Sequence, residues 1–118
     1  MSKFYRENGT VLFNMFGMDA EVSADELKAN STDAAGEKHV PQVTKNGKEI
    51  VVEVGSVAHP MLEAHYIMGV YVETTNGGQL QRFKPGDEPR AVFTLKDGEE
   101  FVAAYEYCNL HGLWKTED

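Results

Sequence analysis

The stretch "HYIMGVYVETTNGGQLQRF", residues 65–83, is the clearest indication of the fold class of this 118-residue chain. Its first half is rich in β-branched and aromatic side chains, which favour extended strands. The segment "TNGGQ" (75–79) places Asn and Gly where a hairpin reverses direction, and "QLQRF" (79–83) follows as a second strand. The stretch therefore predicts an antiparallel β-hairpin.

The same alternation of strand and turn continues on both sides of this hairpin. Further β-prone runs occupy 48–54, 90–95 and 99–108. Between them lie Gly-containing turns of the kind that reverse hairpins, at "KNGK" (45–48), "KPGDEP" (84–89) and "KDGEE" (96–100). Several short strands at this spacing, without a long helical period, predict an all-β antiparallel β-sandwich.

The first 36 residues have a different character. "TVLFNMFGM" (10–18) predicts a strand, and "SADELKANSTDAAG" (23–36) predicts a short helical turn followed by a loop, with Ser23 and Glu26 spaced as in a capping box. This segment is too short to bury a core of its own. We therefore expect a short N-terminal appendage packed on a sandwich domain that spans residues 37–118.

Composition excludes several classes of protein. The net charge is −8, from 19 acidic and 11 basic residues, and no basic stripe of the kind that binds nucleic acid is present. No apolar run approaches the roughly 20 residues that span a bilayer, and the charged residues near the start do not fit a secretory signal. A single cysteine forms no disulfide within the chain. We expect a cytoplasmic protein with no nucleic-acid or membrane partner.

All four histidines and the one cysteine fall in segments predicted to be loops or strand ends. His39 stands just before a proline that starts an extended segment, and His59 and His65 enclose "HPMLEAH". Cys108 and His111 lie where the last predicted strand ends. A single histidine is usually an ordinary core or surface residue, but in a sandwich the loops of one end lie together. The joint placement therefore predicts a metal site.

The types of ligand narrow the metal. Imidazole and thiolate suit zinc, copper and iron. Structural zinc sites are usually built from paired cysteines, and this chain has one. Blue-copper sites use a methionine soon after the last histidine, and "GLWKTED" follows His111 without one. Four imidazoles and one thiolate suggest a five-coordinate, square-pyramidal iron with an open position; a β-sandwich copper electron-transfer protein is the alternative.

Three segments, "EKHVP", "HPMLEAHYI" and "CNLHGLW", resemble the signature segments of the superoxide reductases, also called neelaredoxins and desulfoferrodoxins. The resemblance spans roughly residues 30–115 and implies an immunoglobulin-like β-sandwich. It implies one-electron reduction of superoxide to hydrogen peroxide at a mononuclear non-haem iron. It also implies the ligands: His39, His59, His65 and His111 in the equatorial plane and Cys108 as the axial thiolate.

The resemblance implies further roles. Lys38 of "EKHVP" matches a lysine that attracts superoxide, and Glu37 matches a carboxylate that binds the sixth position of ferric iron. A rubredoxin-like protein is the implied electron donor, and a homo-oligomer, dimer or tetramer, is the implied assembly. The rest of the site gives two smaller predictions: backbone N–H groups of Asn109 and Leu110 face the cysteine sulfur, and Trp114 serves in packing.

The N-terminal appendage also resembles a known module. Residues 1–36 are similar to the rubredoxin-like module of desulfoferrodoxins and to its connection to the catalytic domain. That module holds a second iron on four cysteines, and this segment contains none. We therefore expect a degenerate module without metal.

Overall fold

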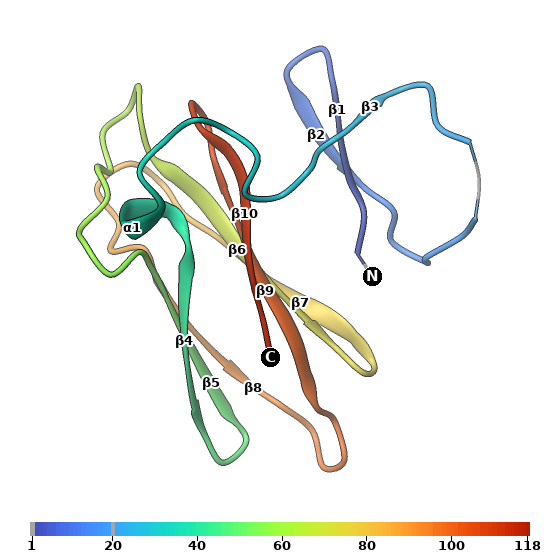
Figure 1. Cartoon of the computed structure of the whole chain (residues 1–118). Helices are drawn as coiled ribbons and strands as arrows, with labels where there is room; N and C mark the ends of the chain where they lie inside the picture. The colour runs from blue at the N-terminus through green and yellow to red at the C-terminus, as the bar shows by residue number, and fades with distance from the viewer. Residues whose placement is uncertain (1, 20) are drawn as a thin grey trace.

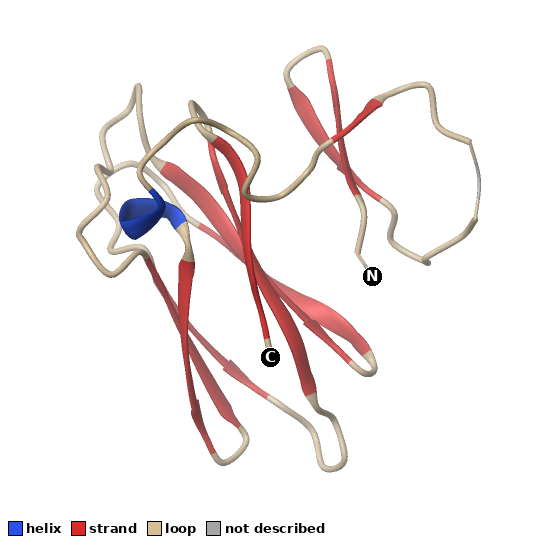
Figure 2. Ribbon diagram, in the orientation of Figure 1, coloured by secondary structure: helices blue, strands red, loops and turns tan. Residues whose placement is uncertain are grey.

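The computed structural model describes residues 2–19 and 21–118. Its strands form three antiparallel sheets, and within the described residues its one helix is the short α1 (Gly36–His39) (Figures 1 and 2). No helix in this part of the chain has the length and apolar character that crossing a bilayer requires. The strands are β1 (Phe4–Glu7), β2 (Thr10–Phe13), β3 (Asp25–Glu26), β4 (Pro41–Asn46), β5 (Glu49–Val54), β6 (Ile67–Thr74), β7 (Gly77–Arg82), β8 (Arg90–Thr94), β9 (Phe101–Cys108) and β10 (Gly112–Glu117).

Two of the sheets make the predicted β-sandwich. One has the strand order β10-β9-β6-β7 and the other β4-β5-β8. Seven antiparallel strands divided four and three, with the chain crossing between the sheets, is an immunoglobulin-like arrangement. The predicted all-β fold is confirmed.

The turns fulfil two different functions. "KNGK" and "TNGGQ" do join paired strands, β4 to β5 and β6 to β7. "KPGDEP" and "KDGEE" do not: they carry the chain from β7 to β8 and from β8 to β9, which belong to different sheets. The prediction of hairpins at these two turns was wrong, because turn residues fix a local bend but not the sheet that the next strand joins.

A bulge in β6 adjusts which side chains enter the core. The pairing with β9 shifts between Ile67 and Gly69, next to the partner of Ile67, Cys108. Because one extra residue is inserted there, Ile67, Val70 and Val72 all face the interior, although strict alternation from Ile67 would not bury Val70. The bulge thus lies at the end of the sandwich where β9 ends at Cys108.

The N-terminal residues form a small sheet of order β2-β1-β3 that packs on the outer face of the four-stranded sheet. Aromatic rings make much of this contact: Phe4 lies 5.0 Å from Tyr105, and Phe13 lies 4.9 Å from Tyr71, between ring centroids. As a result β9 is covered on both faces, by the sandwich core and by this sheet.

The predicted helical turn at the start of 23–36 was wrong. Asp25 and Glu26 form β3 and pair with Arg6 and Tyr5 of β1. The backbone N–H of Leu27 then donates to the Phe4 carbonyl (2.8 Å). The capping-box pattern predicted a helix, but Asp25 and Glu26 pair with β1 instead, and Leu27 packs between the N-terminal sheet and the sandwich.

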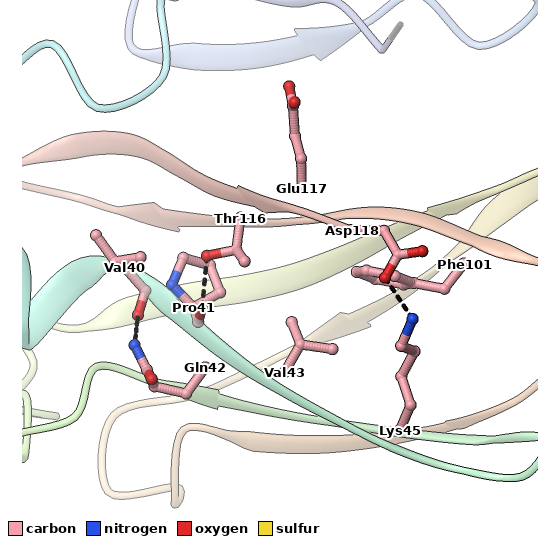
Figure 3. Close-up of a pocket in the computed structure, with 9 residues that line it drawn as sticks. All are labelled: Val40, Pro41, Gln42, Val43, Lys45, Phe101, Thr116, Glu117 and Asp118. Atoms are coloured by element: carbon pink, nitrogen blue, oxygen red, sulfur yellow. Dashed lines mark hydrogen bonds and ion pairs between the residues drawn. The ribbon is translucent and has the colours of Figure 1, made fainter.

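The first and last strands of the sandwich are tied together along one side. The hydroxyl of Thr116 in β10 donates to the carbonyl of Pro41 in β4 (2.6 Å), and Lys45 pairs with Asp118 farther along (Figure 3). A hollow of about 380 Å³ remains between these two edges. Because β4 follows His39 and β10 follows His111, these contacts hold two of the predicted ligand segments next to each other.

Candidate metal centre

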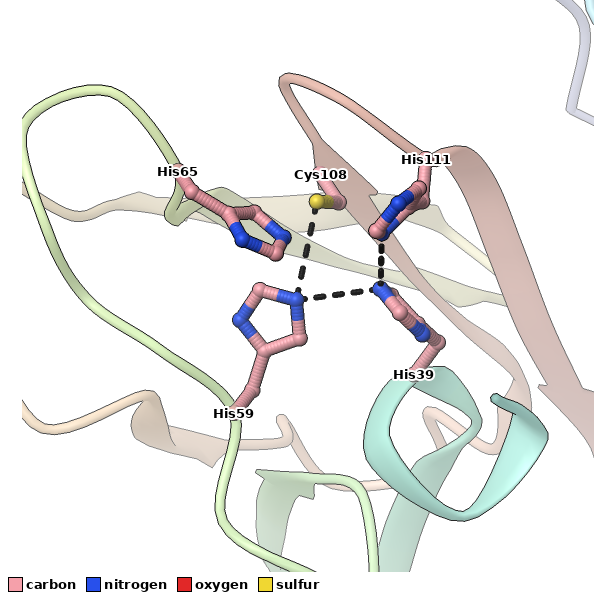
Figure 4. A group of neighbouring side chains, drawn as sticks. All are labelled: His39, His59, His65, Cys108 and His111. Carbon is pink, nitrogen blue, oxygen red and sulfur yellow. Dashed lines mark hydrogen bonds between the residues drawn. The ribbon is translucent and has the colours of Figure 1, made fainter. Parts of the chain in front are cut away.

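The fold brings all five predicted ligands to one end of the sandwich. Their ligand atoms all lie within 4.8 Å of one another (Figure 4). Their positions in the chain differ: His39 ends α1, His59 and His65 lie between β5 and β6, Cys108 ends β9 and His111 lies in the turn before β10. His39 was expected in a loop, and its place in a helical turn corrects that expectation.

The four imidazoles form a closed square. Neighbouring rings are 4.6–4.9 Å apart between centroids and stand at 76–86° to each other. The order around the square is His39, His59, His65, His111 and back to His39. Such a ring of imidazoles, edge to face, directs four nitrogens at a common centre, with the Cys108 sulfur close by, 3.6 Å from Nε2 of His59.

Distances between the nitrogens match a metal site. Nε2 of His39 lies 3.0 Å from Nε2 of His59 and 3.1 Å from Nδ1 of His111. Two nitrogens that bind one metal at about 2.1 Å and at a right angle are about 3.0 Å apart. The square therefore has the size that a transition metal requires.

Hydrogen bonds to the main chain orient two of the rings. Nδ1 of His39 donates to the Ala35 carbonyl (2.8 Å), and Nδ1 of His59 donates to the Pro60 carbonyl (2.6 Å). In a neutral imidazole this leaves a lone pair on each Nε2, so two acceptors face one another across 3.0 Å. A cation between them removes that repulsion, and the residues therefore fit a bound metal.

Burial keeps three of the imidazoles in the neutral form that binds metal. The pKa of His59 is lowered to about 4, first by burial and then by the neighbouring histidines, against a raising effect of its bond to Pro60. Burial likewise lowers the pKa of His39 and of His65. Nε2 of His65 is buried and has no hydrogen-bond partner, as expected of a nitrogen that binds a metal.

The cysteine is fully buried, and this burial raises the pKa of the Cys108 thiol. Backbone N–H groups of Leu110 and His111 act in the opposite direction and lower it. The expected pair was Asn109 and Leu110, but the N–H of Asn109 donates to the Tyr66 carbonyl instead (3.3 Å). Cys108 can be a thiolate at this buried position only if its negative charge is stabilised by those two N–H groups and by a cation.

Trp114 contacts the site more directly than the prediction of simple packing implied. Its indole stacks on the His39 ring, with centroids 5.0 Å apart and planes at 21°. Its Nε1 donates to the His111 carbonyl (3.0 Å), which also accepts from the hydroxyl of Thr32. The signal in the sequence was its position three residues after the last histidine.

Glu37 and Lys38 lie in α1, immediately before His39. Glu37 is exposed and Lys38 is half-buried. The positive charge of Lys38 contributes to the lowered pKa of both His39 and His65, so it lies close to the square. Gly55 packs against this turn: a Cβ there would come within 2.7 Å of the Glu37 and Lys38 backbone, at a φ of +77° that favours glycine.

Comparison with known proteins agrees with this geometry. The family model described as Desulfoferrodoxin matches residues 31–117. A desulfoferrodoxin of Syntrophotalea carbinolica is 47% identical over 91 residues, which cover 77% of this chain and 71% of that protein. A desulfoferrodoxin of Clostridium acetobutylicum is 37% identical, and the match covers 95% of this chain and 91% of that protein.

A solved structure extends the likeness to the whole chain. The crystal structure of the superoxide reductase from Treponema pallidum matches with a TM-score of 0.85 and 35% identity, and the match covers 99% of both chains. The three signature segments, the ring of ligands and the family model all lie within residues 31–117. The chain therefore belongs to the desulfoferrodoxin family.

Proposed function

We propose that the protein is a superoxide reductase with one mononuclear non-haem iron. Family membership and the likeness to the Treponema pallidum enzyme support this function. The observation that carries the proposal is the square of four imidazoles with a buried thiol beside it (Figure 4). When bound there, ferrous iron supplies the single electron that, with two protons, converts superoxide to hydrogen peroxide, and the iron becomes ferric.

The donor set favours iron over a blue-copper centre. Copper sites of that type use two imidazoles, one thiolate and a weak axial methionine. Here four imidazoles converge, and the sulfur of Met61, which lies between two ligands in the sequence, accepts the N–H of Ile67 (3.4 Å) instead. Metal analysis of the purified protein tests this: about one iron per chain is expected.

Cys108 is the proposed axial ligand. Its thiolate would hold a bound iron and donate electron density to it, as the thiolate of certain haem enzymes does. The N–H groups of Leu110 and His111 stabilise its negative charge and so moderate this donation. His65 and His111 are only half-buried, so water reaches this side of the site and is the proposed source of both protons.

Lys38 is the residue proposed to attract superoxide. The chain carries a net charge of −8, which repels an anion. Lys38 is half-buried, and its positive charge acts on His39 and His65, so it provides a local positive potential at the site. Lys38 thus guides the substrate against the field of the whole protein.

Glu37 is the proposed sixth ligand of the oxidised iron. Ferric iron is a harder cation than ferrous iron and therefore binds a carboxylate more strongly. Glu37 belongs to the same short helix as His39 and is exposed, so its side chain is free to approach or leave the metal. Reduction of a bound iron would weaken this interaction and favour the free carboxylate.

Other features of the proposal concern the surroundings of the site. Turnover needs an electron donor, and a small rubredoxin-like protein is proposed for that task.

Residues 1–36 contain no cysteine, which supports a metal-free N-terminal module. The chain has one cysteine and so forms no disulfide of its own, which agrees with the reducing cytoplasm that we propose as its location. The outer edge of β7, the last strand of its sheet in the described chain, supports assembly into a dimer or tetramer.

The decisive test is the stoichiometry of the reaction. The iron-loaded, reduced protein is mixed with superoxide, and peroxide and dioxygen are measured. Reduction gives one peroxide for each superoxide consumed, with no dioxygen. Release of dioxygen shows dismutation, and no consumption of superoxide by the iron-loaded protein overturns the function altogether.

A further inference from the structure

The side chain of Asn109 joins the two loops that carry four of the five proposed ligands. Its Oδ1 accepts the backbone N–H of Tyr66 (3.0 Å), and its Nδ2 donates to the carbonyl of Ala64 (3.0 Å). Its own backbone N–H donates to the Tyr66 carbonyl (3.3 Å). These three bonds connect the residue that follows Cys108 with the residues on both sides of His65.

The backbone of His65 itself is held in the same way. Its N–H donates to the Leu62 carbonyl, and its carbonyl accepts the Leu62 N–H, both at 2.9 Å. With the bonds from Asn109, the polar backbone groups next to the His65 Cα are paired on both sides. The direction in which the His65 side chain leaves the backbone is therefore fixed.

The ring of His65 needs this backbone support more than the rings of His39 and His59 do. His39 and His59 each hold their ring with a bond from Nδ1 to a nearby carbonyl. Among the hydrogen bonds of the described residues none of that kind involves the His65 ring, and its Nε2 is buried without a partner. Its aim at the centre of the square must come from its backbone.

We propose that Asn109 is a positioning residue, which sets the direction of His65 and its spacing from Cys108 before the metal binds. The inference rests on the proposed iron site and adds to it a residue that does not contact the metal. Outer partners that orient ligands typically contribute roughly 10–100-fold to metal affinity. Asn109 differs from the usual case because it holds the backbone of the ligand rather than its ring.

The test compares Asn109→Ala with Asn14→Ala. Asn14 makes two bonds of the same kinds in the N-terminal part of the chain: its Nδ2 donates to the Met18 carbonyl (2.8 Å), and its Oδ1 accepts the Met18 N–H (3.2 Å). The affinity of each apoprotein for Fe²⁺ is measured by competition with a chelator, and the exchange of the Tyr66 amide is followed by NMR. Asn109→Ala should weaken Fe²⁺ binding by roughly 10-fold or more and speed that exchange, whereas Asn14→Ala should change neither.

Each result separates this inference from the proposed function. If the unsubstituted protein binds no iron, the proposed function fails. If it binds iron and Asn109→Ala binds Fe²⁺ equally well, only the role of Asn109 is overturned. Should Asn109→Ala not fold, the unsubstituted apoprotein decides: a Tyr66 amide that exchanges more slowly than that of Glu63 supports a clamp formed before metal binding, and equal rates overturn it.

Discussion

The two halves of the imidazole square are held by different means. On one side His39 and His59 are buried, and each ring is oriented by a bond from its own Nδ1 to a carbonyl of a nearby residue. On the other side His65 and His111 are half-buried, and contacts with the main chain around them set their directions. One half is thus buried and oriented through its own rings, and the other is half-buried and oriented through the main chain around it.

Removal of one ring from each half tests the difference between them most strongly. His39→Ala should abolish iron binding and lower the free energy of unfolding of the apoprotein by roughly 2–3 kcal/mol, because it leaves a cavity under Trp114 and an unpaired Ala35 carbonyl. His65→Ala should also abolish iron binding but cost less than about 1 kcal/mol. Iron content and denaturant unfolding measure both effects. Equal stability losses would contradict the division into two halves.

Acid should act mainly on the buried half. The pKa of His59 is about 4 in the folded protein against 6.5 in an unfolded chain, so between these values the unfolded state binds more protons. Stability of the apoprotein should therefore fall as the pH drops from about 7 to about 5, by up to about 2 kcal/mol from this group. Denaturant unfolding at several pH values measures the slope. In His59→Gln the slope should be smaller, and an unchanged slope would remove His59 as its source.

Lys38 connects the two halves, since its charge reaches both His39 and His65. Lys38→Ala should slow the second-order reaction with superoxide by about 10-fold at low salt and flatten its dependence on ionic strength. Stopped-flow kinetics provide the measurement. Lys45→Ala is the matched control, because Lys45 pairs with Asp118 along β4 and β10. A control that slows as much as Lys38→Ala would show that only net charge matters.

Glu37 gives the smallest expected change in rate and a clear change in spectrum. Glu37→Ala should alter the absorption spectrum of the oxidised iron, because the sixth position loses its carboxylate, while the rate with superoxide changes by less than about two-fold. Spectra of the oxidised protein and of the variant are compared at one pH. If the two spectra coincide, Glu37 does not bind the oxidised iron.

The sequence predicted the sandwich and the residues of the square, but not every element. The hairpin at 65–83 followed from local turn chemistry. Strand β10 was not predicted, since Lys115, Thr116 and Glu117 make its second half polar, as is usual for an edge strand. A crossover such as "KPGDEP" has the same residue types as a hairpin turn. It differs from a hairpin only in the sheet that the next strand joins, which the local sequence does not specify.

The ligands could be predicted because each is a residue type with metal chemistry, and the family motifs group them. The residues that hold them could not. Asn109 reaches Ala64 across 45 positions of the chain, and Trp114 stacks on His39 across 75 positions. Such contacts depend on how two loops meet in space, and neither residue type by itself indicates the partner.

The stacking of Trp114 on His39 has a practical consequence. It is the only tryptophan in the chain, so all indole fluorescence of this protein comes from a ring that touches a proposed iron ligand. Loading and loss of the metal are therefore expected to change the emission of the unlabelled protein. The same signal would follow the metal site in real time during chelation, refolding or mixing with an electron donor.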